Sequence, residues 1–363
     1  MEKLLDYYTD YLHASFGQTT ATGLSRLLDK EISHDKITRM LSSTEKKSKD
    51  LWLNVKPLVR KHESDDGCLI FDDSIIEKNY TDENDLICWH YDHSKGRSVK
   101  GINLLTAFYH TQGKEEEIPL RVPVAFETIK KTVKYQDKKT GKEKRKSDES
   151  KNEMMRNMIQ EALNKELKFR YVLADSWFSS KENISFVHEA KKFFIFDIKQ
   201  NRLVTKSASG QNNRSFEKIS DFDIPEHTPL KVCLKDVSFC VLLIKQVFRN
   251  KDGSIGVRYL VSNDLSLTND DFETIYKKRW SVEEYHKSLK QNNAIGKSPA
   301  RTVTTQTNHI FASMIAYVKL EKYKLSKKLS QFTIKTKIYY EAMKGAFAEV
   351  QKMKNELNAL CSA

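Results

Sequence analysis

The stretch FRYVLADSWFSSKENISFVHEAKKFFIFDIK, residues 169–199, contains two short apolar runs on either side of a segment with a helical pattern. The run YVLA ends at Asp175 and the run FFIF follows the helical segment, and both have the length of buried strands. Ser179 or Ser180 is expected to cap the helix between them. A strand, a helix and a second strand in succession predict an α/β fold with a mixed sheet.

Composition narrows the classes of protein. The chain has 363 residues, of which 39% are hydrophobic, so it can form a core in more than one domain. Its formal net charge of +13 favours a polyanionic partner, nucleic acid before membrane, although a basic protein without such a partner has the same composition. The five cysteines are scattered and lack CxxC spacing, so neither a disulfide framework nor a zinc site is expected.

The hydropathy pattern predicts no membrane partner. No apolar run approaches the roughly 18 residues that a spanning helix needs. The segment MEKLLDYYTDYLH at the start of the sequence is acidic and interrupted, unlike a signal peptide. We therefore expect a cytoplasmic protein.

Changes of pattern along the chain predict four parts. They are a helical N-terminal DNA-binding region (1–62), a mixed α/β core (63–199 and 263–320), a β-rich insertion (200–262) and a basic helical C-terminal region (321–363). In the first part, two short helices around a tight turn predict a helix-turn-helix that presents Lys36 and Arg39 to DNA. Any small helical bundle has the same pattern, so both interpretations stay open.

Two further basic segments are candidates for phosphate contacts. The segment from Arg121 to Lys151 is rich in lysine and predicts a solvated loop. The turn in YDHSKGRSVK carries Lys95 and Arg97 before a strand, where they are expected either to contact DNA or to be solvated.

Three acidic positions on separate elements indicate a joint role. Asp72 or Asp73 ends the apolar run of GCLIFDDS, Asp175 ends VLAD, and Glu283 lies in the helical segment YKKRWSVEEYHKSLK. A single aspartate at such a place is usually a cap or turn residue, but α/β sheets also place functional groups at strand ends. Carboxylates held together need a cation, and two Mg²⁺ or Mn²⁺ ions about 3.5–4 Å apart can assist phosphoryl displacement.

The segment around Glu283 places charged residues on one face of an expected helix over residues 276–290. One interpretation is a solvated face with ion pairs such as Glu283 with Lys287, each worth about 0.2–0.5 kcal/mol. The other is that Arg279 and Lys290 hold the phosphates beside a scissile bond, while His286 and Lys287 contact DNA.

These motifs resemble a known family. Tyr276, Arg279, Glu283 and Lys290 have the spacing of the Tyr–Arg–Glu–Lys signature of bacterial insertion-sequence DDE transposases of the insertion sequence four type. LADSWFSS is similar to the second-aspartate motif of that group, and IFDDS is similar to its first. The resemblance implies a ribonuclease-H-like fold, with a β-rich insertion before the last catalytic helix.

The resemblance also implies roles for single residues. Asp175 and Glu283 would bind metal, and Tyr276, Arg279 and Lys290 would contact terminal DNA. The group often has Asp-x-Ser/Thr at its first aspartate, which favours Asp72, and the alternative register selects Asp73.

The implied activity is Mg²⁺-dependent cleavage of transposon ends and strand transfer into target DNA, with two ions per active site and Mn²⁺ as a substitute. The implied partners are double-stranded DNA, as terminal inverted repeats and target, and a second copy of the chain in a DNA-bound homodimer associated with the nucleoid. The alternatives are a stand-alone ribonuclease-H-like nuclease and a catalytically inactive DNA-binding repressor or domesticated transposase.

Overall fold

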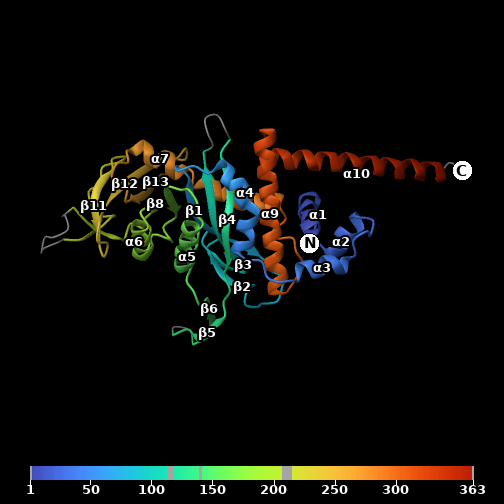
Figure 1. Cartoon of the computed structure of the whole chain (residues 1–363), viewed down its shortest axis with the longest axis horizontal. Helices are drawn as coiled ribbons and strands as arrows, with labels where there is room; N and C mark the ends of the chain where they lie inside the picture. The colour runs from blue at the N-terminus through green and yellow to red at the C-terminus, as the bar shows by residue number, and fades with distance from the viewer. Residues whose placement is uncertain (1, 113–117, 139–140, 207–214, 362–363) are drawn as a thin grey trace. The chain divides into compact units, whose positions relative to one another are not determined.

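The computed structural model describes residues 2–112, 118–138, 141–206 and 215–361 (Figure 1). The chain forms two compact units, which we call the terminal unit (Met1–Lys46 with Tyr285–Ala363) and the sheet unit (Lys47–Glu284). The four parts expected from the sequence stay a prediction. Of the polar segment SASGQNNRS at residues 207–215, all but Ser215 lies outside the described residues.

The elements of each unit are as follows. The sheet unit contains the helices α4 (Ser48–His62), α5 (Lys151–Asn164), α6 (Lys181–Glu189) and α7 (Asn269–Lys277). Its strands are β1 (Cys68–Glu77), β2 (Cys88–Asp92), β3 (Arg97–Thr111), β4 (Leu120–Thr128), β5 (Val133–Gln136), β6 (Glu143–Lys146), β7 (Tyr171–Ala174), β8 (Phe193–Asp197), β9 (Leu203–Thr205), β10 (Glu217–Lys218), β11 (Leu230–Leu234), β12 (Cys240–Arg249) and β13 (Ile255–Ser262). The terminal unit contains α1 (Glu2–Ala14), α2 (Ala21–Leu27), α3 (His34–Leu41), α9 (Val303–Lys327) and α10 (Gln331–Cys361), and the unit boundary falls inside α8 (Trp280–Asn292).

Strand β1 lies between an antiparallel and a parallel part of one sheet. On one side it pairs antiparallel with β3, which pairs antiparallel with β2 and β4. On the other side it pairs parallel with β7, and β7 pairs parallel with β8 (Figure 1). The order β4-β3-β1-β7-β8 with these directions is a ribonuclease-H-like arrangement, so the predicted fold class is confirmed.

The residues between β8 and α7 extend the same sheet. Strand β13 pairs antiparallel with β8, and β12, β11, β9 and β10 follow in that order. The predicted β-rich insertion before the last catalytic helix is therefore present as an extension of the central sheet.

The sequences of the central strands explain their positions. Nearly every residue of β3 from Gly101 onward is buried, as expected for a strand covered on both faces. Pro123 lies in β4, and the β3–β4 register shifts next to its partner Phe108. Proline has no N–H to donate to a strand ladder, so a bulge is where a proline is tolerated. Helix α4 packs on β4, and α6 packs on β8.

The solvated loop expected within the lysine-rich segment is wrong in part. Strands β5 and β6 form an antiparallel hairpin there, in which Val133 pairs with Lys146 and Gln136 with Glu143. An ion pair across the two strands stabilises this hairpin, because Lys134 Nζ lies 3.1 Å from Glu143 Oε1.

The terminal unit has its own helical core. Residues of α1, α2 and α3 pack with residues of α9 in one apolar cluster that includes Leu12, Leu24, Ile37 and Ala312. Thr20 caps α2 and Ser33 caps α3 through their side-chain oxygens. In the part of the chain that the structure describes, no helix is long and apolar enough to cross a membrane.

Candidate active site

The strand register brings three aspartates to one edge of the parallel strands. Phe71 of β1 pairs with Ala174 of β7, and Ala174 pairs with Phe196 of β8. An aspartate follows each of these residues, namely Asp72, Asp175 and Asp197. Because side chains alternate along a strand, residues in register on parallel strands leave the sheet on the same face.

Burial and mutual repulsion perturb all three carboxyl groups. Burial, followed by the negative charge of Asp175, raises the pKa of Asp72 from 3.8 to about 7. Burial likewise raises the pKa of Asp175, and the charge of Asp73 acts in the same direction, although the N–H of Trp177 donates to the Asp175 carboxylate at 2.9 Å. Burial also raises the pKa of Asp197 to about 6, and Asp175 acts in the same direction. The three groups therefore form one electrostatically coupled cluster.

Asp73 has a different environment. Its carboxylate accepts a hydrogen bond from Lys151 Nζ at 2.8 Å, in an ion pair with the first residue of α5. Neighbouring residues on a strand point to opposite faces, so Asp72 and Asp73 cannot both join the cluster in the same way. The charge of Asp73 nevertheless raises the pKa of Asp175, so the choice between Asp72 and Asp73 as the first aspartate of the motif stays a prediction.

The helix expected over residues 276–290 is interrupted, so that prediction is wrong in this detail. Helix α7 ends at Lys277 and α8 begins at Trp280. Between them the backbone makes hydrogen bonds of the i to i−3 type, such as Arg279 N–H to the Tyr276 carbonyl at 2.9 Å. Such a tightened turn within a helix often marks a functional position.

Arg279 lies at this interruption and interacts with two carboxylates. It forms a hydrogen bond with Glu283 and is affected by the charge of Asp72. Its Nη2 donates to Glu283 Oε1 at 2.7 Å. Burial opposes the charge of Arg279, but Tyr276, Asp72 and Glu283 outweigh burial and raise the pKa of the guanidinium. The structure therefore pairs Glu283 with Arg279 and not with Lys287, the partner considered from the sequence.

Tyr276 and Arg258 lie next to Arg279, and Tyr276 holds it in place. The Tyr276 side chain is buried, and its hydroxyl donates to the Ala174 carbonyl at 3.3 Å. The guanidinium carbons of Arg258 and Arg279 lie 5.0 and 5.6 Å from the centre of the Tyr276 ring. Tyr276 thus positions Arg279 beside the last residue of β7, and a contact between Tyr276 and DNA requires that its side chain become exposed.

The donor chemistry suits a divalent cation, although the carboxylates do not enclose one. Among the described residues, no group of three or more His, Cys, Asp or Glu side chains is arranged so that it could hold a metal ion. The carboxylate oxygens of Asp72 and Asp175 nevertheless suit Mg²⁺ or Mn²⁺, because a cation would offset the burial and the repulsion between aspartates that raise their pKa values.

The other residues expected to contact DNA lie in varied places. Lys287 and Lys290 are exposed on α8, whereas His286 is buried and must become exposed to contact DNA. Lys95 forms an ion pair with Glu77, and Arg97 is exposed at the start of β3.

The two residues of the expected helix-turn-helix lie in the terminal unit. Lys36 and Arg39 are exposed on α3, and α2 precedes it across a short connection. Trp280, the first residue of α8, is 59% exposed.

Sequence reasoning missed Asp197 and Lys151. Asp197 ends the apolar run FFIF in the same way that Asp175 ends VLA, and this repeated pattern is the signal that could have identified it. Lys151 lies in a segment rich in lysine, where nothing in the sequence distinguishes it from its neighbours.

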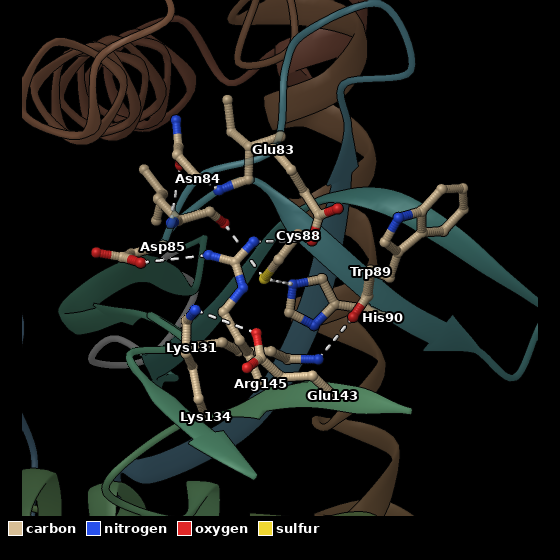
Figure 2. A network of polar contacts seen from close by, with 12 residues as sticks. Glu83, Asn84, Asp85, Cys88, Trp89, His90, Lys131, Lys134, Glu143 and Arg145 are labelled. Carbon is tan, nitrogen blue, oxygen red and sulfur yellow. Dashed lines mark hydrogen bonds and ion pairs between the residues drawn. The ribbon is translucent and has the colours of Figure 1, made fainter. Parts of the chain in front are cut away.

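A polar network lies around Arg145 and His90 (Figure 2). Arg145 of β6 pairs with Glu83 at 3.0 Å and with Asp85 at 3.3 Å. Burial, followed by the charges of Lys131 and Lys151, lowers the pKa of His90 to about 4, so this histidine is neutral at pH 7. The ion pairs of Arg145 connect the β5–β6 hairpin to the segment that precedes β2.

Comparison with known proteins gives one family. A family model described as DDE superfamily endonuclease matches residues 1–209, more than half of the 363 residues. The matched region includes Asp72, Asp175 and Asp197, whereas Glu283 lies beyond it. No curated protein shows a significant match to the chain.

Proposed function

Because the chain belongs to the DDE superfamily of endonucleases, we propose that it is a cut-and-paste transposase that cleaves transposon ends and joins them to target DNA. Family membership implies a nuclease-type enzyme that acts on DNA with divalent metal ions. The Tyr–Arg–Glu–Lys signature of Tyr276, Arg279, Glu283 and Lys290 supports the insertion sequence four type.

Asp72, Asp175 and Glu283 are the proposed metal ligands. The observation that carries this proposal is the register that places Asp72 and Asp175 one residue beyond the paired Phe71 and Ala174. Arg279 donates to Glu283, and the charge of Asp72 acts on the same guanidinium. Two bound Mg²⁺ ions, or Mn²⁺ as a substitute, would supply Lewis-acid activation of the attacking oxygen and stabilise the leaving oxygen. Asp197 adds negative charge next to Asp175 and supports cation binding.

Arg279 has a second proposed role. When Glu283 turns to a cation, Arg279 loses its carboxylate partner and is free to bind a DNA phosphate, which guanidinium groups do in a bidentate geometry. Lys290 lies seven residues after Glu283 on α8, and two full helical turns bring it to the same face. Both residues would then contact the DNA strand at the scissile bond.

A homodimer is the proposed assembly on DNA. The support is helix α10, in which every residue from Tyr340 to Leu360 is exposed. Five of its large apolar residues have the spacing of a coiled-coil seam, with intervals of three, four, three and seven; they are Tyr340, Met343, Phe347, Val350 and Leu357.

The experiment compares Glu283→Gln with Glu284→Gln. Loss of the Glu283 charge is expected to abolish metal-dependent cleavage of end-containing DNA while binding to that DNA persists. Glu284 is the matched control because its carboxylate pairs with Arg121 at 2.7 Å and is 51% exposed, so its loss costs little stability. Undiminished cleavage by Glu283→Gln would rule out the assignment.

A strand-transfer assay with tagged target DNA separates transposition from simple cutting. Joined products that depend on Glu283 support the transposase. Cleavage without joining would instead identify a stand-alone nuclease.

A further inference from the structure

Several exposed aromatic side chains lie in a row that ends next to the candidate active site. Trp89 and Tyr91 alternate with buried residues on β2 and are 53% and 57% exposed. The His93 ring centre lies 4.9 Å from that of Tyr91 and 6.0 Å from that of Trp177. We call Trp89, Tyr91, His93 and Trp177 the aromatic row.

One end of the row is joined to a proposed metal ligand. Trp177 is 46% exposed, and its backbone N–H donates to the Asp175 carboxylate at 2.9 Å. The Trp177 ring and the Asp175 carboxylate therefore project from the same short turn after β7. A molecule that stacks on Trp177 lies beside the proposed cleavage site.

Cations accompany the rings. Lys151 Nζ lies 4.7 Å and Lys199 Nζ 5.7 Å from the centre of the Trp177 ring. Lys131 Nζ donates to the backbone carbonyl of Trp89 at 2.6 Å, while the Trp89 ring points away from the polar network (Figure 2). Aromatic faces interleaved with cations are typical of surfaces that bind single-stranded nucleic acid.

The spacing of the rings favours an unpaired strand over a duplex. Residues two apart on a strand are about 6.6 Å apart, which is twice the roughly 3.4 Å between stacked bases of one duplex strand. In a duplex both faces of each base are covered by its neighbours. Only bases that have separated from each other can each cover one ring of the row.

A cleft beside Trp177 has room for a base. Its volume is about 420 Å³, and its other walls come from the segment that leads into α5. Its lining carries both acceptors for base amino groups and cations for a phosphate; these residues are Asp148, Glu149 and Glu153 with Lys146 and Lys151. The cleft can therefore receive a nucleotide whose base stacks on Trp177.

We propose that the aromatic row binds an unpaired segment of DNA strand, with one base on Trp177 and the next bases on Tyr91 and Trp89. The proposal rests on the proposed function only in placing this segment next to the bond that is cleaved. Stacking on the row needs neither metal nor catalysis.

The test measures binding of a labelled oligothymidine of about 16 nucleotides to the full chain without divalent metal. Each base that stacks on an aromatic residue contributes about 1–3 kcal/mol, so Trp177→Ala or Trp89→Ala is expected to weaken binding about 5- to 150-fold. Trp177→Phe should retain most of the affinity, because a smaller aromatic face remains. Affinity for a duplex of the same length should change little.

Tyr80→Ala is the matched control, because Tyr80 is a fully exposed aromatic residue of the sheet unit outside the row. Alanine variants of the row that bind oligothymidine as tightly as the wild type overturn the inference, as does an equal loss of duplex binding. Glu283→Gln should bind the single strand normally. Normal single-strand binding without any wild-type cleavage would refute the proposed function and leave the row in place.

Discussion

Asp72 carries a negative charge that the folded chain disfavours. Its pKa is raised from 3.8 to about 7 by burial and by Asp175, so the folded state holds a proton more tightly than the unfolded state. A carboxyl group with a raised pKa makes stability fall as pH rises from about 4 to about 7, and the loss is complete above that range. Binding of a cation would reverse this penalty.

Replacing Asp72 with asparagine should therefore stabilise the metal-free protein at pH 8. A shift of about 3 pKa units corresponds to at most about 4 kcal/mol in the free energy of unfolding. Urea unfolding in the presence of EDTA at pH 5 and pH 8 measures the effect, which should be small at pH 5. Added Mg²⁺ should raise the stability of the wild type more than that of Asp72→Asn.

Asp73→Asn is the control at this scale. It removes the ion pair with Lys151 and should give no stabilisation at pH 8. Equal pH dependence of wild type and Asp72→Asn would contradict the assigned environment of Asp72.

The single residues show where sequence reasoning ends. Asp175 was identifiable because a strand of apolar residues leads to it, and the same signal was present at Asp197. The sequence left Asp72 and Asp73 as alternatives, since it does not show which face of a strand is covered. The pairing of Glu283 with Arg279 depended on the interruption of the helix.

At the scale of elements, the interruption between α7 and α8 decides what Arg279 can reach. The stripe of charged residues predicted one regular helix, because spacing is all that a sequence provides. The β5–β6 hairpin was not predicted, because its sequence has no spacing pattern that indicates strands. Its strands are short and charged, and pairs such as Lys134 with Glu143 support them only once the two strands face each other.

Arg279→Ala and Lys290→Ala test whether these elements bind DNA. If each residue contacts one phosphate, either change should weaken binding to end-containing DNA and reduce the slope of log affinity against log salt by about 0.9. Titrations at several salt concentrations provide the slope. Lys251→Ala, an exposed lysine at the β12–β13 turn, should leave the slope as it is in the wild type.

Unchanged slopes in both variants would restore the alternative, in which Arg279 only pairs with Glu283 and Lys290 is a solvated side chain. In that case Arg279→Ala should still affect cleavage, because Glu283 would lose its neutralising partner.

At the scale of the whole molecule, the fold class followed from the sequence more readily than the division into units. Runs such as VLAD and FFIF are local signals, and they predicted the mixed sheet. The terminal unit joins residues from both ends of the chain, and contacts such as the hydrogen bond between Tyr8 and His309, at 2.9 Å, have no local pattern. Long-range packing of this kind depends on how well the two surfaces fit together. It is not visible in the spacing of residues along the sequence.

The exposed helix α10 predicts that the chain forms a homodimer. A helix whose residues from 340 to 360 are all exposed gains little from packing within its own chain, and Gly345 costs it about 1 kcal/mol. This stretch contains three lysines and three glutamates, Lys344, Lys352, Lys354, Glu341, Glu349 and Glu356, so its net charge is zero and it does not attract DNA. Lys354 falls at a seam position, where a polar residue favours a defined oligomer over open-ended association.

Phe347→Glu, at the centre of the seam, should therefore convert a homodimer into a monomer. Two glutamates facing each other in a buried seam would be unpaired charges, which cost several kcal/mol. Sedimentation equilibrium with and without end-containing DNA measures the mass. Ala348→Glu should leave the mass unchanged, because this side chain points about 100° away from that of Phe347 and lies off the seam. A wild-type chain that remains monomeric on its DNA, or a Phe347→Glu variant that remains dimeric, would show that α10 has another partner.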